Sequence, residues 1–286
     1  MSTISHLGHY RLLSVVSVGQ TTQLWYAYDE PNRNFVGVKM LLPKFARDRT
    51  QMASLKWELK ISQDVDDERI IKIHEYGYEE KTSFLVMEWF PAPNMKMILN
   101  KGYAIYASHL PTILPLMTEG LAALHQKKWV HRDVKPDNFL YDPDERTLKV
   151  IDFGIAQKVP SGLSKIFFVR KRAQGTASYM SGEQILGKPT DERSDVYSLG
   201  CTFFELLTGK LPYTGNSLNE LLQKHISGGV PPVSVRNRNL TPEMINLLTA
   251  MMAKKADDRP KSCVELLDYI KKIRIFRRNP SGEDLA

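Results

Sequence analysis

Short runs of apolar residues, separated by turn-forming residues, dominate the first 90 positions of the chain. The runs are rich in β-branched, leucine and aromatic residues, a composition typical of strands. They predict strands over residues 10–18, 24–28, 35–41 and 83–89. One stretch, residues 51–63, has the spacing of a helix instead, and either Thr50 or Asp48 can cap it.

After the Pro-Ala-Pro-Asn stretch at residues 91–94, apolar residues recur mainly at helical spacing. A long helix is predicted over residues 109–128. Pro111 and Pro115 fit only near its start, because proline removes a backbone donor from a helix interior. The run at residues 196–207 is apolar on nearly all sides, so we expect a buried helix there.

These patterns predict an α+β fold, in which a β-rich part with one main helix precedes a mostly helical part. The change of pattern divides the chain into residues 1–90, residues 91–276 and a tail at residues 277–286. A chain of 286 residues has room for one large domain or for two lobes around a shared cleft.

The net charge of the chain favours an anionic partner without identifying it. Lysine and arginine number 39 against 32 acidic residues, which gives +7. Much of the excess lies in residues 165–172 and 271–278. Neither run stands beside an RNA-binding motif or a zinc-finger spacing, so no nucleic-acid partner is expected. The second run is interpreted as a solvated helix end, with an acidic membrane surface as the alternative.

The remaining composition, with 42% hydrophobic residues, is ordinary for a soluble globular protein. We expect a cytoplasmic location. Cys201 and Cys263 lie far apart and match no metal-binding spacing, so two buried thiols in a reducing compartment are favoured over a disulfide. No apolar stretch reaches the roughly 18–20 residues that a spanning helix needs, so no membrane span is expected in this chain.

The clearest chemical signal is HRDVKPDNFL at residues 131–140, followed by LKVIDFG at residues 148–154. Asp133 and Asn138 lie five positions apart, and Asp152 follows Asp133 by 19 positions. One carboxylate can face a hydroxyl nucleophile. The amide oxygen of Asn138 and the carboxylate of Asp152 can hold Mg²⁺, which prefers oxygen ligands.

In this order the motifs resemble the H-R-D-x-K-x-x-N catalytic loop and the D-F-G motif of eukaryotic-like (Hanks-type) serine/threonine protein kinases, in a form most similar to bacterial members. The resemblance covers roughly residues 10–273. It implies a bilobal protein-kinase fold that uses ATP and Mg²⁺, with Mn²⁺ as an alternative metal, to phosphorylate Ser and Thr hydroxyls of proteins. Lys135 and Thr176, both implied to act beside Asp133, mark Ser/Thr rather than Tyr kinases.

The same resemblance implies nucleotide-binding residues. The VGVK stretch is similar to the strand whose lysine, here Lys39, binds the α- and β-phosphates, and Glu58 takes the place of the glutamate that orients this lysine. Met87 corresponds to the gatekeeper, and the backbones of Glu88 and Phe90 correspond to the adenine contacts. The other implied contacts are Val16, Ser17, Val18, Gly19, Leu24, Gly37 and Leu140.

Three further residues are implied to be structural. Asp195, in SDVYSLG, is similar to the aspartate that accepts hydrogen bonds from the catalytic-loop backbone. Glu183, in GTASYMSGE, is implied to pair with Arg259, in DDRP. Small-molecule kinases share the Asp–Asn–Asp set but lack this segment and its Glu–Arg pair, so they are disfavoured.

The chain departs from the family at the glycine-rich loop, where G-x-G-x-x-G-x-V aligns with Ser17, Gly19, Thr22 and Leu24. Only the middle glycine is retained. The backbone N–H donors remain, so we expect nucleotide handling that is weaker or slower by about tenfold, not abolished. Gly37 also replaces the usual alanine, which loses a small contact with adenine.

The segment before GTASYMSGE has no Ser or Thr between Val169 and Gln174, where activating phosphates are often carried. Ser161 and Ser164 are the nearest alternatives, and the basic run at residues 165–172 is expected to meet an acidic partner or substrate.

Every charged member of the catalytic set is present, which favours an active kinase. The alternative is a pseudokinase that acts as a nucleotide-binding scaffold, and it rests on the altered loop and on Gly37. Asp137 and Glu205 occupy positions that favour a basic residue before the phosphoacceptor.

Overall fold

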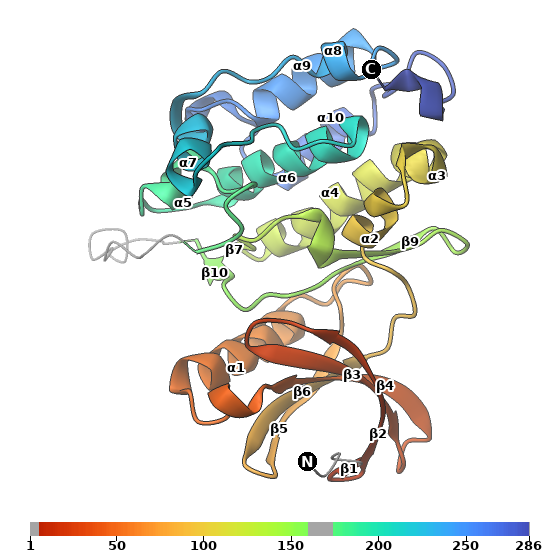
Figure 1. Ribbon diagram of the computed structural model, residues 1–286, viewed down its shortest axis with the longest axis vertical. Coiled ribbons are helices and arrows are strands. Elements are labelled where there is room, and N and C mark those ends of the chain that lie inside the picture. The colour runs from red at the N-terminus through yellow and green to blue at the C-terminus, as the bar shows by residue number, and fades with distance from the viewer. Residues whose placement is uncertain (1–5, 160–173, 286) are drawn as a thin grey trace. The chain divides into compact units, whose positions relative to one another are not determined.

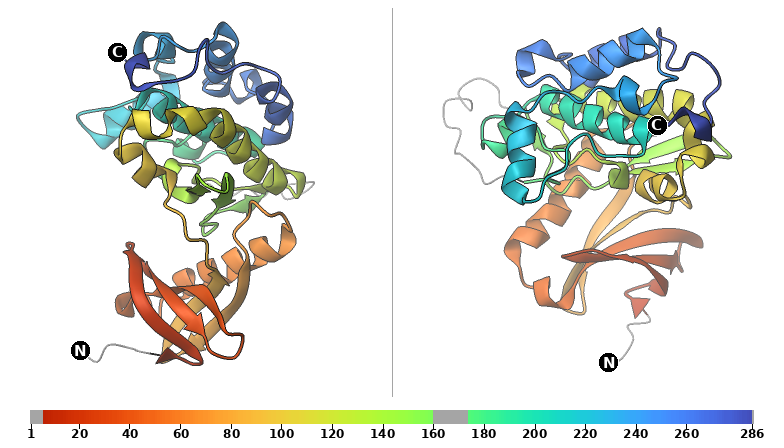
Figure 2. Two further views of the ribbon diagram at one scale, coloured as in Figure 1. Left: turned by 90° about the vertical axis from the view of Figure 1, so that its right-hand side faces the viewer. Right: turned by 45° about the horizontal axis from the view of Figure 1, so that its top comes forward.

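The structure, a computed structural model, describes residues 6–159 and 174–285 (Figures 1 and 2). The chain forms two compact units. Unit 1 comprises Met1–Pro91 together with Asp152–Gly154, and unit 2 comprises Ala92–Ile151 and Ile155–Ala286.

Unit 1 is built on a curled antiparallel sheet with the strand order β1-β2-β3-β4-β6-β5 (Figure 1). The strands are His6–Leu7 (β1), Tyr10–Val18 (β2), Thr22–Asp29 (β3), Asn34–Leu41 (β4), Ile73–Glu79 (β5) and Thr82–Glu88 (β6). Sequence patterns predicted four of these six strands. They missed β1, which has only two residues, and β5, most of whose residues are polar or face solvent.

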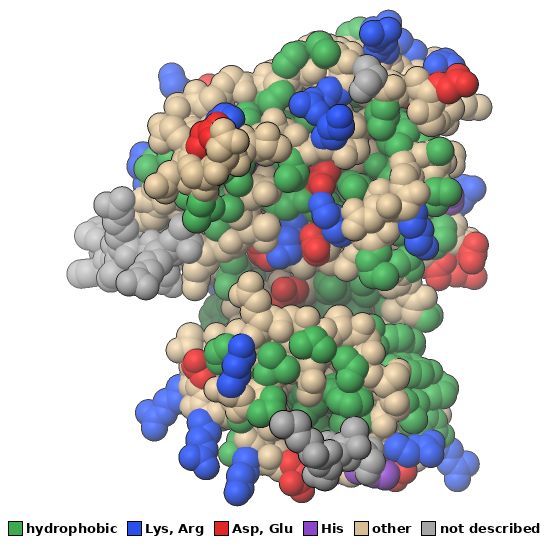
Figure 3. All heavy atoms as spheres, in the orientation of Figure 1, with side chains coloured by type: hydrophobic (Ala, Val, Ile, Leu, Met, Phe, Trp, Pro, Cys, Tyr) green, Lys and Arg blue, Asp and Glu red, His purple; other side chains and the backbone are tan. Residues whose placement is uncertain are grey.

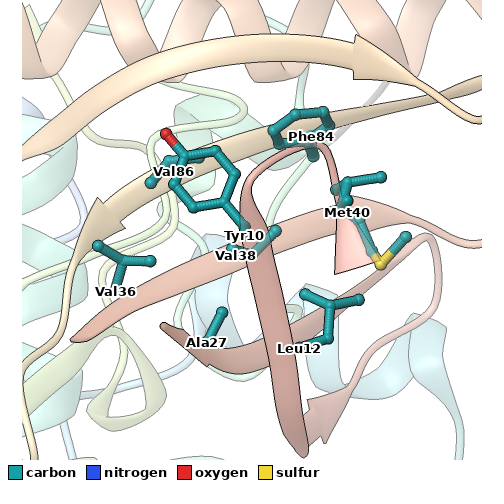
Figure 4. Close-up of a cluster of buried hydrophobic side chains, with 9 residues drawn as sticks. Tyr10, Leu12, Ala27, Val36, Val38, Met40, Phe84 and Val86 are labelled. Atoms are coloured by element: carbon teal, nitrogen blue, oxygen red, sulfur yellow. The ribbon is translucent and has the colours of Figure 1, made fainter. Parts of the chain in front are cut away.

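The core of unit 1 lies on one face of the sheet (Figure 4). Its members come from β1, β2, β3, β4 and β6, and the largest are Tyr10, Met40 and Phe84. The ring of Phe84 lies against Gly77 of β5, where a Cβ would approach it to 2.1 Å. A side chain at position 77 would therefore displace this ring from the core.

One long helix, α1 (Arg49–Asp64), packs on β5 and β6. Asp48 is its cap, since its Oδ1 accepts from the N–H groups of Thr50 and Gln51 at 2.8 and 3.2 Å. The buried face of α1 carries Leu55 and Ile61, and also the carboxylate of Glu58. A carboxylate in that position needs a partner inside the unit.

Unit 2 is mostly helical (Figure 2). Its helices are α2 (Met95–Asn100), α3 (Tyr103–Tyr106), α4 (Leu110–Gln126), α5 (Gly182–Ile185), α6 (Glu192–Thr208), α7 (Leu218–Ser227), α8 (Val233–Arg236), α9 (Pro242–Met251) and α10 (Cys263–Ile270). Helix α6, predicted as a buried helix, is in contact with α4, α9 and α10, and almost all its residues are buried. Pro111 lies in the first turn of α4, as predicted, whereas Pro115 lies further inside that helix.

Two small antiparallel ribbons complete unit 2 and carry the loops that matter for function. Strand β7 (Trp129–Val130) pairs with β10 (Gln157–Lys158), and β8 (Phe139–Asp142) pairs with β9 (Thr147–Val150). The HRDVKPDN residues lie between β7 and β8, where a short 3-10 helix, Pro136–Asn138, turns the chain.

The predicted helix end at residues 271–278 is only partly right. Helix α10 ends at Ile270, and residues 271–280 form no helix. Ile275 and Phe276 are buried, and Phe276 forms a bridge with Leu240. The basic side chains of this segment remain exposed.

Cys201 and Cys263 are both buried and free. Burial raises the pKa of each thiol above its ordinary value. Among residues 6–159 and 174–285, no helix combines the length and the apolar character needed to cross a membrane.

Candidate active site

Three of the predicted site residues form an ion-pair cluster in unit 1. Lys39 Nζ, from β4, lies 2.8 and 2.9 Å from the two carboxylate oxygens of Glu58 and 3.1 Å from Oδ1 of Asp152. The side chain of Glu58 is 4% exposed, whereas that of Asp152 is 45% exposed. The half-buried lysine is thus held by one enclosed and one accessible carboxylate.

Burial and charge act in opposite directions on this cluster. Burial lowers the pKa of Lys39, but the charges of Asp152 and Glu58 outweigh it, so the pKa lies above its ordinary value. Burial raises the pKa of Glu58 to about 6, although Lys39 opposes that shift. Lys39 therefore keeps its positive charge at neutral pH.

A hydroxyl on α1 holds the Asp152–Gly154 segment. Ser54 Oγ donates a hydrogen bond of 3.1 Å to the carbonyl oxygen of Gly154. A Cβ at Gly154 would approach that Oγ to 2.8 Å, so only glycine permits the contact without movement. Asp152 has a φ of 67°, a strained conformation for a residue with a side chain. The sequence prediction did not include Ser54, although it lies one helical turn before Glu58 on the same face.

The segment predicted to bind phosphate is a tight β2–β3 turn. Gly19 N–H donates to the Thr22 carbonyl at 2.8 Å. Gly19 is not among the residues with positive φ, so its conformation there does not require glycine. Val16 and Val18 are 47% and 65% exposed, and Ser17 pairs with Leu24 across the hairpin.

Gly37 of β4 lies beside Met87 of β6, its direct cross-strand neighbour. A Cβ at position 37 would come within 3.1 Å of Met87 Cγ and 3.5 Å of Leu24 Cδ1. Met87 therefore occupies space that an alanine at position 37 would need. This contact gives a physical reason for the departure from the usual alanine.

The residues predicted to meet adenine through their backbones lie at the end of β6. Glu88 N–H donates to the Lys72 carbonyl at 2.9 Å, and Glu88 Oε1 accepts from Lys72 N–H at 2.7 Å. Phe90 follows the strand, and its N–H makes no hydrogen bond within the described parts of the chain. Leu140, the remaining predicted nucleotide contact, lies in β8 of unit 2 and forms a bridge with Asn94.

A second polar cluster, in unit 2, surrounds Asp133. Lys135 Nζ lies 2.7 Å from Asp133 Oδ2 and 2.8 Å from Thr176 Oγ1. The N–H and the hydroxyl of Thr176 both donate to Asp133 Oδ1, each at 2.9 Å. Asn138 Nδ2 donates to the Asp133 carbonyl at 2.7 Å. The amide of Asn138 is therefore bound through its nitrogen, and its oxygen, Oδ1, makes no hydrogen bond with any described residue.

The loop that carries Asp133 is held by a buried carboxylate. Asp195, at the start of α6, accepts from the N–H groups of His131 and Arg132 at 2.6 and 2.8 Å. His125 Nε2 lies 3.1 Å from the same carboxylate. Arg132 has a φ of 69°, so these bonds hold the backbone in a strained turn immediately before Asp133.

Gly175 is required where the Thr176 segment approaches this loop. Its φ is 118°, and a Cβ there would lie 2.9 Å from the Arg132 carbonyl oxygen. Gln184 Nε2 also donates to that oxygen, at 2.8 Å. Thr176 thereby contacts Asp133, although the two residues lie 43 positions apart in sequence.

Glu183 and Arg259 form an ion pair deep in unit 2. The guanidinium of Arg259, which is 0% exposed, donates to both carboxylate oxygens of Glu183 at 2.7 and 3.2 Å. Burial raises the pKa of Glu183, but the Arg259 hydrogen bonds and charge outweigh it, so the pKa lies below its ordinary value. The carboxylate is therefore ionised at neutral pH.

Glu205, predicted to favour basic substrates, already has partners. Lys96 Nζ and Tyr179 Oη each lie 2.5 Å from one of its carboxylate oxygens, and Glu205 is 3% exposed. Lys96 was not identified as such a partner from the sequence, because a contact between residues 109 positions apart has no local signal. Asp137 is the more accessible of the two predicted residues.

Two predicted features lie outside the described residues: the alternative phosphosites Ser161 and Ser164, and the basic run at residues 165–172. Within the described ranges, no group of three or more His, Cys, Asp or Glu residues is arranged to hold a metal.

Residues 10–269 match the protein kinase domain family. The chain is 30% identical over 279 residues to the serine/threonine-protein kinase PknA of Mycobacterium tuberculosis, covering 96% of this chain and 63% of that protein. It is 28% identical to PrkC of Bacillus subtilis over 265 residues, covering 92% of this chain and 40% of that protein. A probable serine/threonine-protein kinase of Clostridium acetobutylicum is also 28% identical, over 93% of this chain and 40% of that protein.

The chain belongs to the protein kinase domain family, and the three relatives named above are bacterial proteins described as serine/threonine-protein kinases, one of them as probable. The predicted α+β protein-kinase fold and the predicted family are thereby confirmed. The chain spans between 40% and 63% of the length of these relatives, which continue beyond the matched region.

Proposed function

We propose that this domain is an active serine/threonine protein kinase, which transfers the γ-phosphate of ATP to Ser and Thr hydroxyls of protein substrates. The observation that carries the proposal is the cluster of Asp133, Lys135 and Thr176, joined by hydrogen bonds of 2.7–2.9 Å. Membership of the protein kinase family supports the same conclusion.

In this proposal Asp133 orients the substrate hydroxyl and accepts its proton. Lys135 lies 2.7 Å from Asp133 Oδ2, so its charge stabilises the carboxylate and the phosphoryl group that approaches it. Thr176 fixes the other oxygen through its N–H and hydroxyl, which prevents rotation of the carboxylate. A positioned base of this kind contributes roughly 10²–10⁴ in rate.

The oxygen donors present fit Mg²⁺, with Mn²⁺ as an alternative. The accessible carboxylate of Asp152 and the amide oxygen of Asn138, whose Nδ2 is bound at 2.7 Å to Asp133, are hard ligands of the preferred type. When bound with ATP, the metal neutralises phosphate charge. Lys39, kept cationic and oriented by Glu58, binds the α- and β-phosphates.

The adenine ring is proposed to contact Gly37, Met87, Leu24 and Leu140, and the backbones of Glu88 and Phe90. The phosphates are proposed to lie against the backbone of residues 16–19, where Gly19 N–H is already bound to the Thr22 carbonyl within the turn. Because Met87 already fills the space beside Gly37, the nucleotide meets the Met87 side chain where most kinases present alanine. The Met87 side chain thereby replaces part of the adenine contact that an alanine at position 37 would make.

We further propose that substrates need no basic residue to neutralise Glu205, because Lys96 does so from within the domain. The substrates are proteins, and an acidic partner at residues 165–172 remains a proposal from the sequence. We place the domain in the cytoplasm, where ATP and reduced thiols are available.

The test is a phosphotransfer assay on a mixed library of Ser- and Thr-containing peptides, with Mg²⁺ and labelled ATP. The wild-type domain should label peptides, and Asp133→Asn should reduce the rate by about 100-fold or more, because the isosteric amide cannot accept the proton. Mass spectrometry should locate phosphate on Ser and Thr.

Asp142→Asn serves as the matched control. Asp142 lies nine positions on, in the β8–β9 hairpin. Among the described residues, its carboxylate accepts hydrogen bonds only from the backbone N–H groups of residues 144 and 145. This variant should keep wild-type activity. Equal activity of Asp133→Asn and wild type would overturn the proposal, and ATP binding without any transfer by the wild type would favour the pseudokinase alternative.

A further inference from the structure

The segment after α10 forms the wall of two neighbouring hollows in unit 2. Its apolar residues Ile275 and Phe276 are 6% and 4% exposed, so they anchor the segment to the unit. Arg277 N–H donates to the Asn239 carbonyl at 2.7 Å, and Asn239 Nδ2 donates to Asp284 Oδ2 at 2.9 Å. The segment is therefore fixed in place while its basic side chains face outward.

The first hollow has an apolar lining with a basic rim. It measures about 390 Å³ and lies between the start of α4 and the residues that follow α10. The hollow is lined by apolar residues and by two arginines: Pro111, Pro115, Ile273, Pro280, Arg274 and Arg278. A hollow of this size accepts two or three side chains of a peptide, near the lower end of the range for binding pockets.

The second hollow is more polar and shares Arg278 with the first. It measures about 520 Å³, and Arg238, Arg277, Glu283 and Asp284 also line it. Asp284 is buried and already binds Arg278 at 2.9 Å. Figure 3 shows basic side chains at this end of unit 2, near the C-terminus marked in Figure 1.

Several cations of this surface have no carboxylate partner among residues 6–159 and 174–285. Arg238, Arg274 and Arg277 form no salt bridge with a carboxylate of residues 6–159 or 174–285, whereas Lys271 pairs with Glu119 at 2.6 Å. Backbone carbonyls hold two of these side chains in place. Arg277 Nε donates to the Leu240 carbonyl, and Arg274 Nη2 donates to the Arg277 carbonyl. Guanidinium groups positioned in this way are arranged to bind carboxylates.

We propose that these two hollows form a docking groove for an acidic peptide segment of a partner protein, one that places an apolar side chain between Pro111 and Pro280 and carboxylates against Arg238, Arg274 and Arg277. The chemistry favours a peptide over a membrane, because none of the isoleucine and phenylalanine side chains that line the first hollow is among the exposed large hydrophobic residues, so none can insert into a bilayer. It also favours a peptide over nucleic acid, since the only aromatic lining residue, Phe276, is 4% exposed and cannot stack on a base.

The test measures binding of the domain to a short fluorescent peptide that alternates Glu with Leu and Phe. Binding should be detected, should weaken as salt is raised from about 50 to about 300 mM, and should be lost when Lys replaces Glu in the peptide. A peptide of Glu and Ser without apolar residues should bind several-fold more weakly. These results separate an apolar groove with a basic rim from a general charge attraction.

The double variant Arg238→Glu/Arg274→Glu should bind the first peptide at least tenfold more weakly. Lys255→Glu/Lys261→Glu, which changes two exposed lysines of unit 2 by the same total charge, should bind as the wild type does. Arg238→Gln/Arg274→Gln gives a milder version of the test if charge reversal prevents folding. None of these residues belongs to the proposed catalytic set, so phosphotransfer to library peptides should continue in all variants.

Two results would overturn the proposal: equal peptide affinity of the Arg238→Glu/Arg274→Glu variant and the lysine control, or no binding of the acidic peptide by the wild type. Binding to vesicles that contain phosphatidylserine, with the same sensitivity to these variants but without peptide binding, would assign the surface to a membrane instead.

Discussion

At the scale of single residues, one hydroxyl determines how the D-F-G segment meets α1. Ser54 Oγ binds the Gly154 carbonyl at 3.1 Å, and Asp152, two residues earlier, is bound to Lys39 at 3.1 Å. The strained φ of Asp152 has to be maintained by contacts on both sides of it. Ser54 is therefore a positioning residue for Asp152.

We predict that Ser54→Ala lowers kcat by about 3- to 10-fold, since one hydrogen bond of about 1 kcal/mol no longer holds the segment. The KM for ATP should change less than kcat, because Lys39 and Glu58 keep their own ion pair. Steady-state kinetics at several ATP concentrations would measure both quantities.

Ser54→Thr provides the control, because its hydroxyl can make the same bond. This variant should recover most of the wild-type kcat. An Ala variant with unchanged kcat, or a Thr variant as slow as Ala, would contradict the positioning role.

At the scale of elements, helix α7 is attached to the rest of unit 2 by its C-terminal turn. Lys254 Nζ donates to the carbonyls of Lys224 and His225, each at 3.0 Å, and to Tyr213 Oη at 2.9 Å. His225 is 1% exposed, and its Nδ1 lies 3.0 Å from Tyr197 Oη. Cationic Lys254 at a helix C-terminus is also favoured by the helix dipole.

This arrangement predicts a loss of stability in acid. Burial, together with the charge of Lys254, lowers the pKa of His225 to about 4, whereas an unfolded histidine titrates near 6.5. Below pH 6.5 the unfolded chain binds a proton that the folded chain does not. The contribution of His225 should therefore decrease the free energy of unfolding by about 2 kcal/mol between pH 7 and pH 5.

Urea unfolding of wild type and His225→Gln at the two pH values measures this contribution. Glutamine cannot take up the proton, so its free energy of unfolding should fall less between pH 7 and pH 5 than that of the wild type. An identical pH dependence in the two proteins would refute the assignment.

At the scale of the molecule, Arg259 joins distant parts of unit 2. Besides the pair with Glu183 of α5, its guanidinium donates to the carbonyl of Arg193 in α6 and to those of Ala253 and Lys254 after α9. Glu183 and Arg259 lie 76 positions apart in sequence. The buried guanidinium of Arg259 thus connects segments that are distant along the chain.

We predict that Arg259→Ala lowers the free energy of unfolding of unit 2 by about 3–5 kcal/mol, because Glu183 would remain buried without its partner. Arg193→Ala is the comparison, since the side chain of Arg193 binds Asp191 and Asp257 nearer the surface. Its expected cost is below about 1 kcal/mol. Chemical unfolding followed by circular dichroism distinguishes the two, and equal costs would contradict the prediction.

Part of this description was available from the sequence because the signal was local. The alternation and spacing of apolar residues located β2, β3, β4, β6, α1, α4 and α6. Strand β5 was missed, because its polar residues become part of a sheet only through pairing with β6. The basic run after α10 was read as a helix end, because burial of Ile275 and Phe276 depends on a bridge to Leu240.

The sequence by itself determined the family and the order of the chemical groups, since short motifs such as HRDVKPDN and DFG keep their residues adjacent in the chain. Only the tertiary structure decided which side chains share a contact. It neutralised Glu205 with Lys96, bound Gly154 to Ser54, and packed Met87 against Gly37. These contacts join residues far apart in sequence, and their energies depend on burial and distance, which no local pattern encodes.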